Sequence, residues 1–83
     1  MNGHAKRAIM TALRKEYNGL LLELVRLAGY DDIKTMTADA FDSRMTPPAF
    51  LKQELAGIDG AYKKLQSLET LSHCIITLLF EEG

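Results

Sequence analysis

The chain has 83 residues and a net charge of −1, with 47% hydrophobic and 25% charged residues. This size and composition are typical of one small globular domain and exclude a disordered chain. The single cysteine excludes an intrachain disulfide, and no stretch approaches the roughly 20 apolar residues of a membrane-spanning helix. The N-terminus does not resemble a signal peptide, because Lys6 and Arg7 interrupt its apolar residues. We therefore expect a cytoplasmic protein with no membrane contact.

Six apolar residues between positions 10 and 27 alternate at intervals of three and four, as in the a and d positions of a coiled coil. They are Met10, Leu13, Tyr17, Leu20, Leu24 and Leu27. The spacing predicts a helix over about 4–28, which Gly29 ends because glycine tolerates the left-handed conformation. Asn18-Gly19 is a turn dipeptide, but the heptad phase continues across it and favours an unbroken helix. Gly19 is a candidate for the close approach of another backbone.

A polar connection is expected over residues 29–37, with Ile33 and Met36 as anchors to the core. Thr37 is a favoured N-cap residue, and Asp39 suits the positive end of a helix dipole. These residues predict a short second helix over about 38–45, held in place by packing because two turns are marginal alone.

The clearest boundary in the sequence is Thr46-Pro47-Pro48, where threonine can cap a helix and proline suits its first position. Apolar residues from Leu51 to Leu65 keep heptad phase across Gly57 and Gly60. This phase favours a continuous third helix over about 47–81, and a bend near 57–60 is the alternative.

These elements predict an all-α fold: an antiparallel hairpin of two long helices with a short connecting helix. Leucines 20, 24, 65 and 68 are expected to be buried along the seam of the hairpin. Because each long helix has only one neighbour in a hairpin, we expect the chain to complete a four-helix bundle by dimerisation.

The charges are unevenly distributed along the chain. Residues 1–30 carry five basic and two acidic residues, whereas residues 31–83 carry five basic and nine acidic residues. The simplest interpretation is that a basic helix packs beside an acidic one. The alternative is a nucleic-acid contact through the basic residues of the first helix, which are Lys6, Arg7, Arg14 and Lys15. Nucleic-acid binding is not expected, because no recognition-helix pair or aromatic stacking set accompanies these residues.

No catalytic or metal-binding motif is present in the sequence. His73 and Cys74 are adjacent, so on a helix they point in different directions, and Cys74 lies in an apolar run as expected of a small buried residue. His4 is too isolated to predict a metal site with them. The four aspartates of residues 31–42 do not have the spacing of an EF-hand loop. We expect neither an enzyme nor a cofactor.

The function that this fold predicts is protein binding, as an adaptor, chaperone or inhibitor that presents an apolar helical surface. The partner is expected to be a second copy, another protein, or both. The apolar C-terminal part of the third helix supplies the expected interface, formed by Leu71, Ile75, Leu78, Leu79 and Phe80. The alternative function is a transcriptional regulator that contacts nucleic acid through the first helix.

Overall fold

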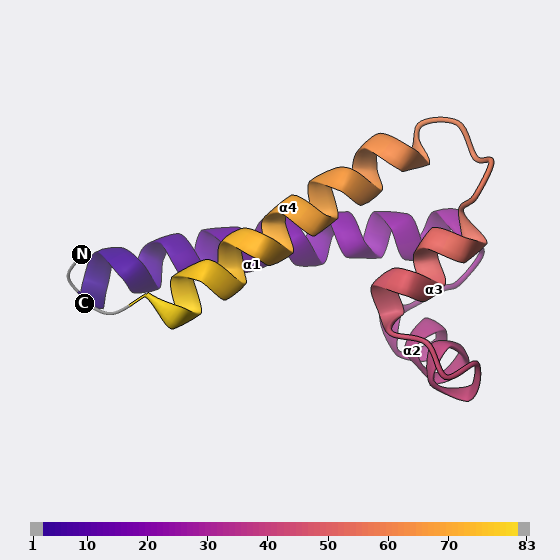
Figure 1. Cartoon of the computed structure of the whole chain (residues 1–83), viewed down its shortest axis with the longest axis horizontal. Coiled ribbons are helices and arrows are strands. Elements are labelled where there is room, and N and C mark those ends of the chain that lie inside the picture. The colour runs from indigo at the N-terminus through magenta and orange to yellow at the C-terminus, as the bar shows by residue number, and fades with distance from the viewer. Residues whose placement is uncertain (1–2, 82–83) are drawn as a thin grey trace.

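The computed structural model describes residues 3–81 and shows four α-helices and no strand in this part of the chain. They are α1 (Gly3–Leu27), α2 (Ile33–Asp42), α3 (Pro47–Glu54) and α4 (Ala61–Phe80). α1 and α4 run antiparallel as a hairpin, and α2 and α3 pack at the end of the hairpin where α1 finishes (Figure 1). The all-α class and the helical hairpin are therefore confirmed.

α1 continues without a break through Asn18-Gly19, as the heptad phase predicts. The helix ends in a Schellman motif, in which the Gly29 N–H donates to the Arg26 carbonyl and the Tyr30 N–H donates to the Val25 carbonyl. Gly29 has a φ of +94°, so its left-handed role is confirmed. The close approach expected at Gly19 is wrong for residues 3–81, because a Cβ placed there would meet no atom within 4 Å.

α2 begins five residues earlier than the sequence predicts, and Asp32 is its N-cap. The Asp32 carboxylate accepts a hydrogen bond of 2.7 Å from the Thr35 N–H, and this bond lowers the pKa of Asp32 below its ordinary value. The predicted cap at Thr37 is wrong, because the Thr37 hydroxyl instead donates to the Ile33 carbonyl inside the helix at 2.8 Å. The earlier start places Ile33 and Met36 on the helix, where Met36 is buried.

The continuous helix predicted over 47–81 is wrong, because residues 55–60 separate α3 from α4. Thr46 caps α3 as predicted, accepting a hydrogen bond from the Ala49 N–H. Gly57 and Gly60 have φ values of +85° and +84°, which are left-handed conformations that cannot continue a right-handed helix. The chain reverses here, so that α4 can return along α1.

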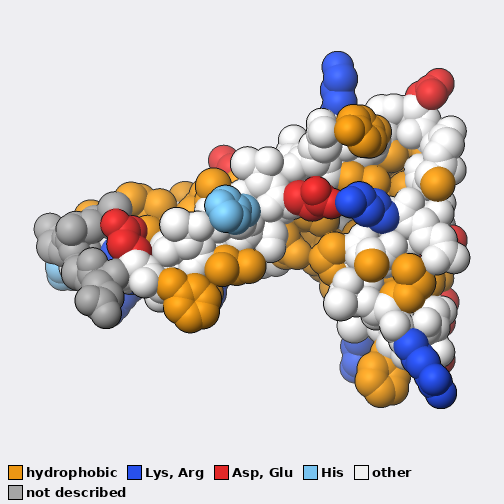
Figure 2. All heavy atoms as spheres, viewed as in Figure 1, with side chains coloured by type: hydrophobic (Ala, Val, Ile, Leu, Met, Phe, Trp, Pro, Cys, Tyr) orange, Lys and Arg blue, Asp and Glu red, His pale blue; other side chains and the backbone are white. Residues whose placement is uncertain are grey.

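Most of the core lies at one end of the molecule. Ten of the twelve buried hydrophobic residues belong to residues 18–67, which we call the head. Residues 3–17 of α1 and 68–80 of α4 form a two-helix arm, in which only Leu68 and Leu78 are buried. Figure 2 shows the narrow arm projecting from the wider head. The molecule is accordingly elongated, with extents of 41 × 26 × 18 Å.

The four leucines expected along the seam are buried or half-buried, but the heptad pattern does not predict burial at the end of α1. Leu24, Leu65 and Leu68 are buried, and Leu20 is half-buried. Leu27, the last heptad position, is 44% exposed, whereas Val25 is fully buried. α2 and α3 pack against α1 from a different side than α4 does. The residues buried near the end of α1 therefore lie on a different side of the helix from the heptad positions.

Polar contacts between elements fix the position of the helices. Lys52 of α3 pairs with Glu69 of α4 at 2.9 Å, which raises the lysine pKa, and Lys64 of α4 pairs with Glu23 of α1. The Tyr30 hydroxyl donates to the Asp39 carboxylate at 2.7 Å, and this hydrogen bond raises the tyrosine pKa to about 12. Both ion pairs are exposed, so they orient the helices more than they stabilise the fold.

Candidate functional site

The arm exposes large apolar side chains that no other part of residues 3–81 covers. Phe80 is 82% exposed, Leu79 54% and Ile76 49%. The three residues are spaced i, i+3 and i+4 on α4, so they form one stripe along the helix. Because only two helices form the arm, no element of residues 3–81 packs over Leu79 and Phe80.

The stripe begins at a hollow between the arm and α3. This hollow, of about 220 Å³, is lined by Tyr17, Pro48, Leu68, Ser72, His73 and Ile76, with Glu69 at its edge. Since Pro48 belongs to α3 and Ile76 to the stripe, the stripe faces the side of the arm on which α2 and α3 project. Figure 2 shows hydrophobic atoms along this edge of the arm.

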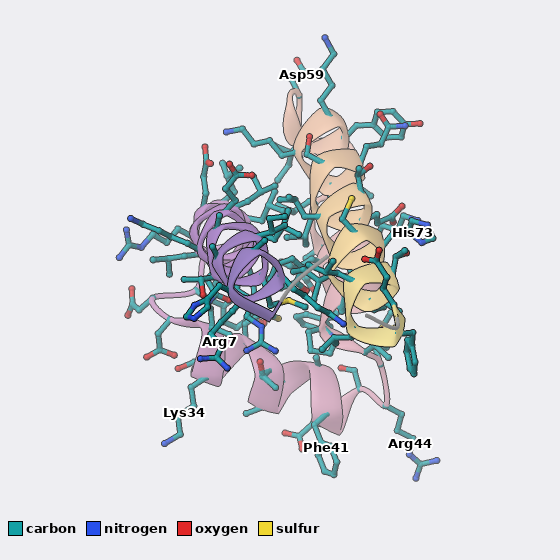
Figure 3. The ribbon with its side chains drawn as sticks, turned by 90° about the vertical axis from the view of Figure 1, so that its left-hand side faces the viewer. Arg7, Lys34, Phe41, Arg44, Asp59 and His73 are labelled. Carbon is teal, nitrogen blue, oxygen red and sulfur yellow. The ribbon has the colours of Figure 1, made fainter. Side chains whose placement is uncertain are left out.

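The neighbouring edge of the arm is basic. Arg7 and Arg14, seven residues apart on α1, line a second hollow of about 310 Å³ together with Lys6, Met10 and Thr11. In Figure 3, which looks along the arm toward the head, Arg7 points to the side on which α2 lies. Neither guanidinium group forms an ion pair with a residue in the range 3–81. We call the surface formed by this basic edge and the apolar stripe the arm groove.

The structure divides the five predicted interface residues into two groups. Leu79 and Phe80 are exposed, as a contact surface requires. Leu71 and Ile75 are half-buried, and Leu78 is only 8% exposed, because these three turn toward α1. Leu78 therefore belongs to the packing of the hairpin. The sequence does not predict three further residues of the site, Ile76, Tyr17 and Pro48. Of these, Ile76 alone has a signal in the sequence, because Leu79 and Phe80 follow it at i+3 and i+4.

The four basic residues proposed for a nucleic-acid contact do not form one surface. Arg7 and Arg14 share a side of α1, whereas Lys15 is one residue further and points about 100° away. The Lys6 ammonium group donates a hydrogen bond of 2.6 Å to the Glu81 carbonyl and so ties the two ends of the described chain together. Two of the four cations are thus available side by side.

The residues considered for catalysis are not brought together. Cys74 is exposed, so its expected burial is wrong; it lies about 200° around α4 from Ile76, on the other side of the arm. His73 points sideways from α4 (Figure 3), and His4 lies at the start of α1. No group of three His, Cys, Asp or Glu residues within 3–81 could hold a metal ion.

A further pocket lies in the head, where the reversal at residues 55–60 leaves a hollow of about 230 Å³ between α3 and α4. Leu55, Ile58 and Tyr62 line it, and the Lys52–Glu69 ion pair lies at its edge. Both ionic groups are already partnered, so this pocket offers no free reactive group.

Comparison with known proteins gives no relative: the chain matches no protein-family model, no curated protein and no solved structure. Among the helices of residues 3–81, none combines the length and the hydropathy that crossing a membrane requires.

Proposed function

We propose that this protein is a small protein-binding module of the adaptor, chaperone or inhibitor type, which acts through the arm groove. The observation that supports the proposal is the exposure of Phe80, Leu79 and Ile76 in one stripe on a two-helix arm. Contiguous apolar surface of this kind marks interaction sites more often than isolated exposed residues do. The proposed role is binding without catalysis.

The stripe offers enough apolar area to matter for binding. A phenylalanine side chain buries roughly 150–250 Å², so covering the 82% exposed Phe80 would remove about 120–200 Å² from water. At about 25 cal/mol per Å², this burial contributes roughly 3–5 kcal/mol before the cost of association is subtracted. A partner that covers Phe80 therefore gains much of its affinity from this one residue.

A matched pair of variants tests the proposal. Phe80 on the arm and Phe41 on α2 are 82% and 81% exposed, so Phe80→Glu and Phe41→Glu make the same change at equal exposure. We expect Phe80→Glu to abolish binding, measured as retention of host proteins on the immobilised chain, and sedimentation equilibrium records any self-association of the same variants. Phe41→Glu should leave this retention unchanged. The reverse pattern would place the contact surface on α2 and would contradict the proposal.

A second candidate function is nucleic-acid binding, favoured by Arg7 and Arg14, which share one side of α1 and form no ion pair with residues 3–81. Phosphate contacts make affinity fall steeply with salt concentration. Retention on DNA or RNA at physiological salt, lost when Arg7, Arg14 and Lys15 are all replaced by glutamine, would support this alternative. We expect no such retention, because Lys6 is engaged with Glu81 and Lys15 points away.

A further inference from the structure

The arm groove has two chemically different edges. Its α4 edge carries the apolar stripe of Ile76, Leu79 and Phe80. Its α1 edge carries the guanidinium groups of Arg7 and Arg14, which have no ionic partner within residues 3–81. A ligand that fits both edges must place apolar groups against α4 and negative charges against α1.

We infer that the arm groove binds an acidic amphipathic helix of another protein. This inference rests on the proposed protein-binding function and names the chemistry of its partner. Residues 3–17 of α1 give the arm a length of about 22 Å, which a partner helix of about 15 residues would match. Such a helix can present apolar residues at i, i+3, i+4 and i+7 on one side and carboxylates beside them, which is the pattern that helix-in-groove recognition uses.

The charges of the arm favour a different protein over a second copy as the occupant. Arm-to-arm pairing would bring another Arg7 and Arg14 to the same surface. Within residues 3–81 the arm and its tip carry three acidic residues that could balance them, Glu16, Glu69 and Glu81. Glu69 is already paired with Lys52, and Glu16 lines a hollow with Lys63 and Leu71 away from the arm groove. A second copy would therefore offer only the Glu81 carboxylate to two arginines, whereas an acidic partner helix can offer a carboxylate to each.

Three synthetic peptides test the inference. Each has about 15 residues with the same leucines on one helical face, and the remaining positions of that face carry glutamate, glutamine or lysine. Binding to the full chain is measured by fluorescence anisotropy at about 0.1 M and about 1 M salt, where the screening lengths are about 10 and 3 Å. We expect the glutamate peptide to bind about tenfold more tightly than the lysine peptide at the lower salt, and this ratio to shrink at the higher salt.

Charge reversal gives a prediction that loss of folding cannot imitate. The double variant Arg7→Glu with Arg14→Glu should bind the lysine peptide more tightly than the glutamate peptide. The control Lys15→Glu, on the same helix but pointing elsewhere, should keep the original preference. Phe80→Glu should weaken binding of all three peptides.

The outcomes separate this inference from the proposed function. If the three peptides bind equally well and Phe80→Glu abolishes all binding, protein binding through the stripe stands and the acidic partner is wrong. If no peptide binds while the chain self-associates and Phe80→Glu dissociates it, the occupant is a second copy and the inference is overturned. Binding of a DNA duplex in place of every peptide, lost in the double arginine variant, would overturn both.

Discussion

Replacing Leu24 by alanine should remove a large part of the stability of this fold, whereas the same change at Leu27 should not. The two leucines lie three residues apart on α1 and both occupy heptad positions, but Leu24 is fully buried and Leu27 is 44% exposed. Leu24 lies in the head, in one core cluster with Met36, Leu51 and Leu65. Truncating a leucine in such a site costs about 2–5 kcal/mol, because the lost transfer free energy is added to the cost of the cavity.

The expected loss is large relative to the total stability. A chain of this size has a free energy of unfolding of about 4–12 kcal/mol. A loss of about 3 kcal/mol should lower the Tm by about 12–24 °C, since each kcal/mol corresponds to about 4–8 °C in a small domain. Leu27→Ala should cost at most about 1 kcal/mol, because roughly half of that side chain is already in water.

Thermal unfolding followed by circular dichroism, supported by urea titration, measures both variants directly. If Leu24→Ala and Leu27→Ala lower the Tm equally, the buried stripe at the end of α1 follows the heptad seam. In that case α2 and α3 do not cover α1 as the structure shows, and the division into head and arm is wrong.

Three further predictions concern the backbone and the caps. Gly19→Ala should raise stability by about 1 kcal/mol in chemical unfolding, because the added Cβ meets no atom of residues 3–81; a loss would indicate an approaching backbone. Arg44→Gly should stabilise the fold by about 1 kcal/mol, because Arg44 follows the Ser43 C-cap of α2 with a φ of +60° that glycine adopts without strain. An unchanged midpoint of chemical unfolding would argue against this conformation. The pKa of Asp32 is lowered in the folded protein, so the stability that its cap contributes is complete above the ordinary aspartate pKa near 4 and is lost as pH falls through the lower folded pKa. Asp32→Asn should therefore flatten the pH dependence of the Tm below pH 4. Equal slopes of Tm against pH in the variant and the original protein would refute the cap.

The sequence was sufficient to predict the elements whose signals are local and unopposed. The heptad phase correctly predicts that α1 continues across Asn18-Gly19. The packing of the helix on both sides of this dipeptide outweighs the unfavourable helix propensity of one glycine. Gly29 ends α1 because a residue without a Cβ adopts the left-handed conformation without strain, and Thr46 begins α3 because its hydroxyl group caps the helix. The antiparallel hairpin followed from the lengths of the two apolar runs.

The prediction failed where two local signals competed. Asp32 and Thr37 are both good N-cap residues. A helix capped by Asp32 has one more turn, and this turn buries Met36 in the core, so the earlier cap is favoured. Across Gly57 and Gly60 the heptad phase was misleading, because α3 and α4 happen to keep their apolar spacing while the chain reverses between them. Periodicity measures the spacing of residues and not the direction of the helix axis.

The sequence predicts only part of the candidate site, because the arm groove combines two segments that are distant in the sequence. The apolar end of α4 indicated Leu79 and Phe80, and the basic cluster indicated Arg7 and Arg14, but as alternatives for different functions. Only the packing of α4 against α1 brings them onto the same arm, where both lie toward the side on which α2 and α3 project. The same packing turns Leu78 inward, which the apolar run alone could not indicate.

Amide hydrogen exchange along α1 tests the central claim most directly, because this single helix passes from the arm into the head. In the free protein, residues 3–17 should exchange faster than residues 21–27, which contribute the buried Leu21, Leu24 and Val25. Adding the tightest-binding peptide should slow exchange in residues 3–17 and 68–80 and leave the head unchanged. Uniform protection along α1 in the free protein, or slowing confined to α2 and α3 on binding, would contradict the account.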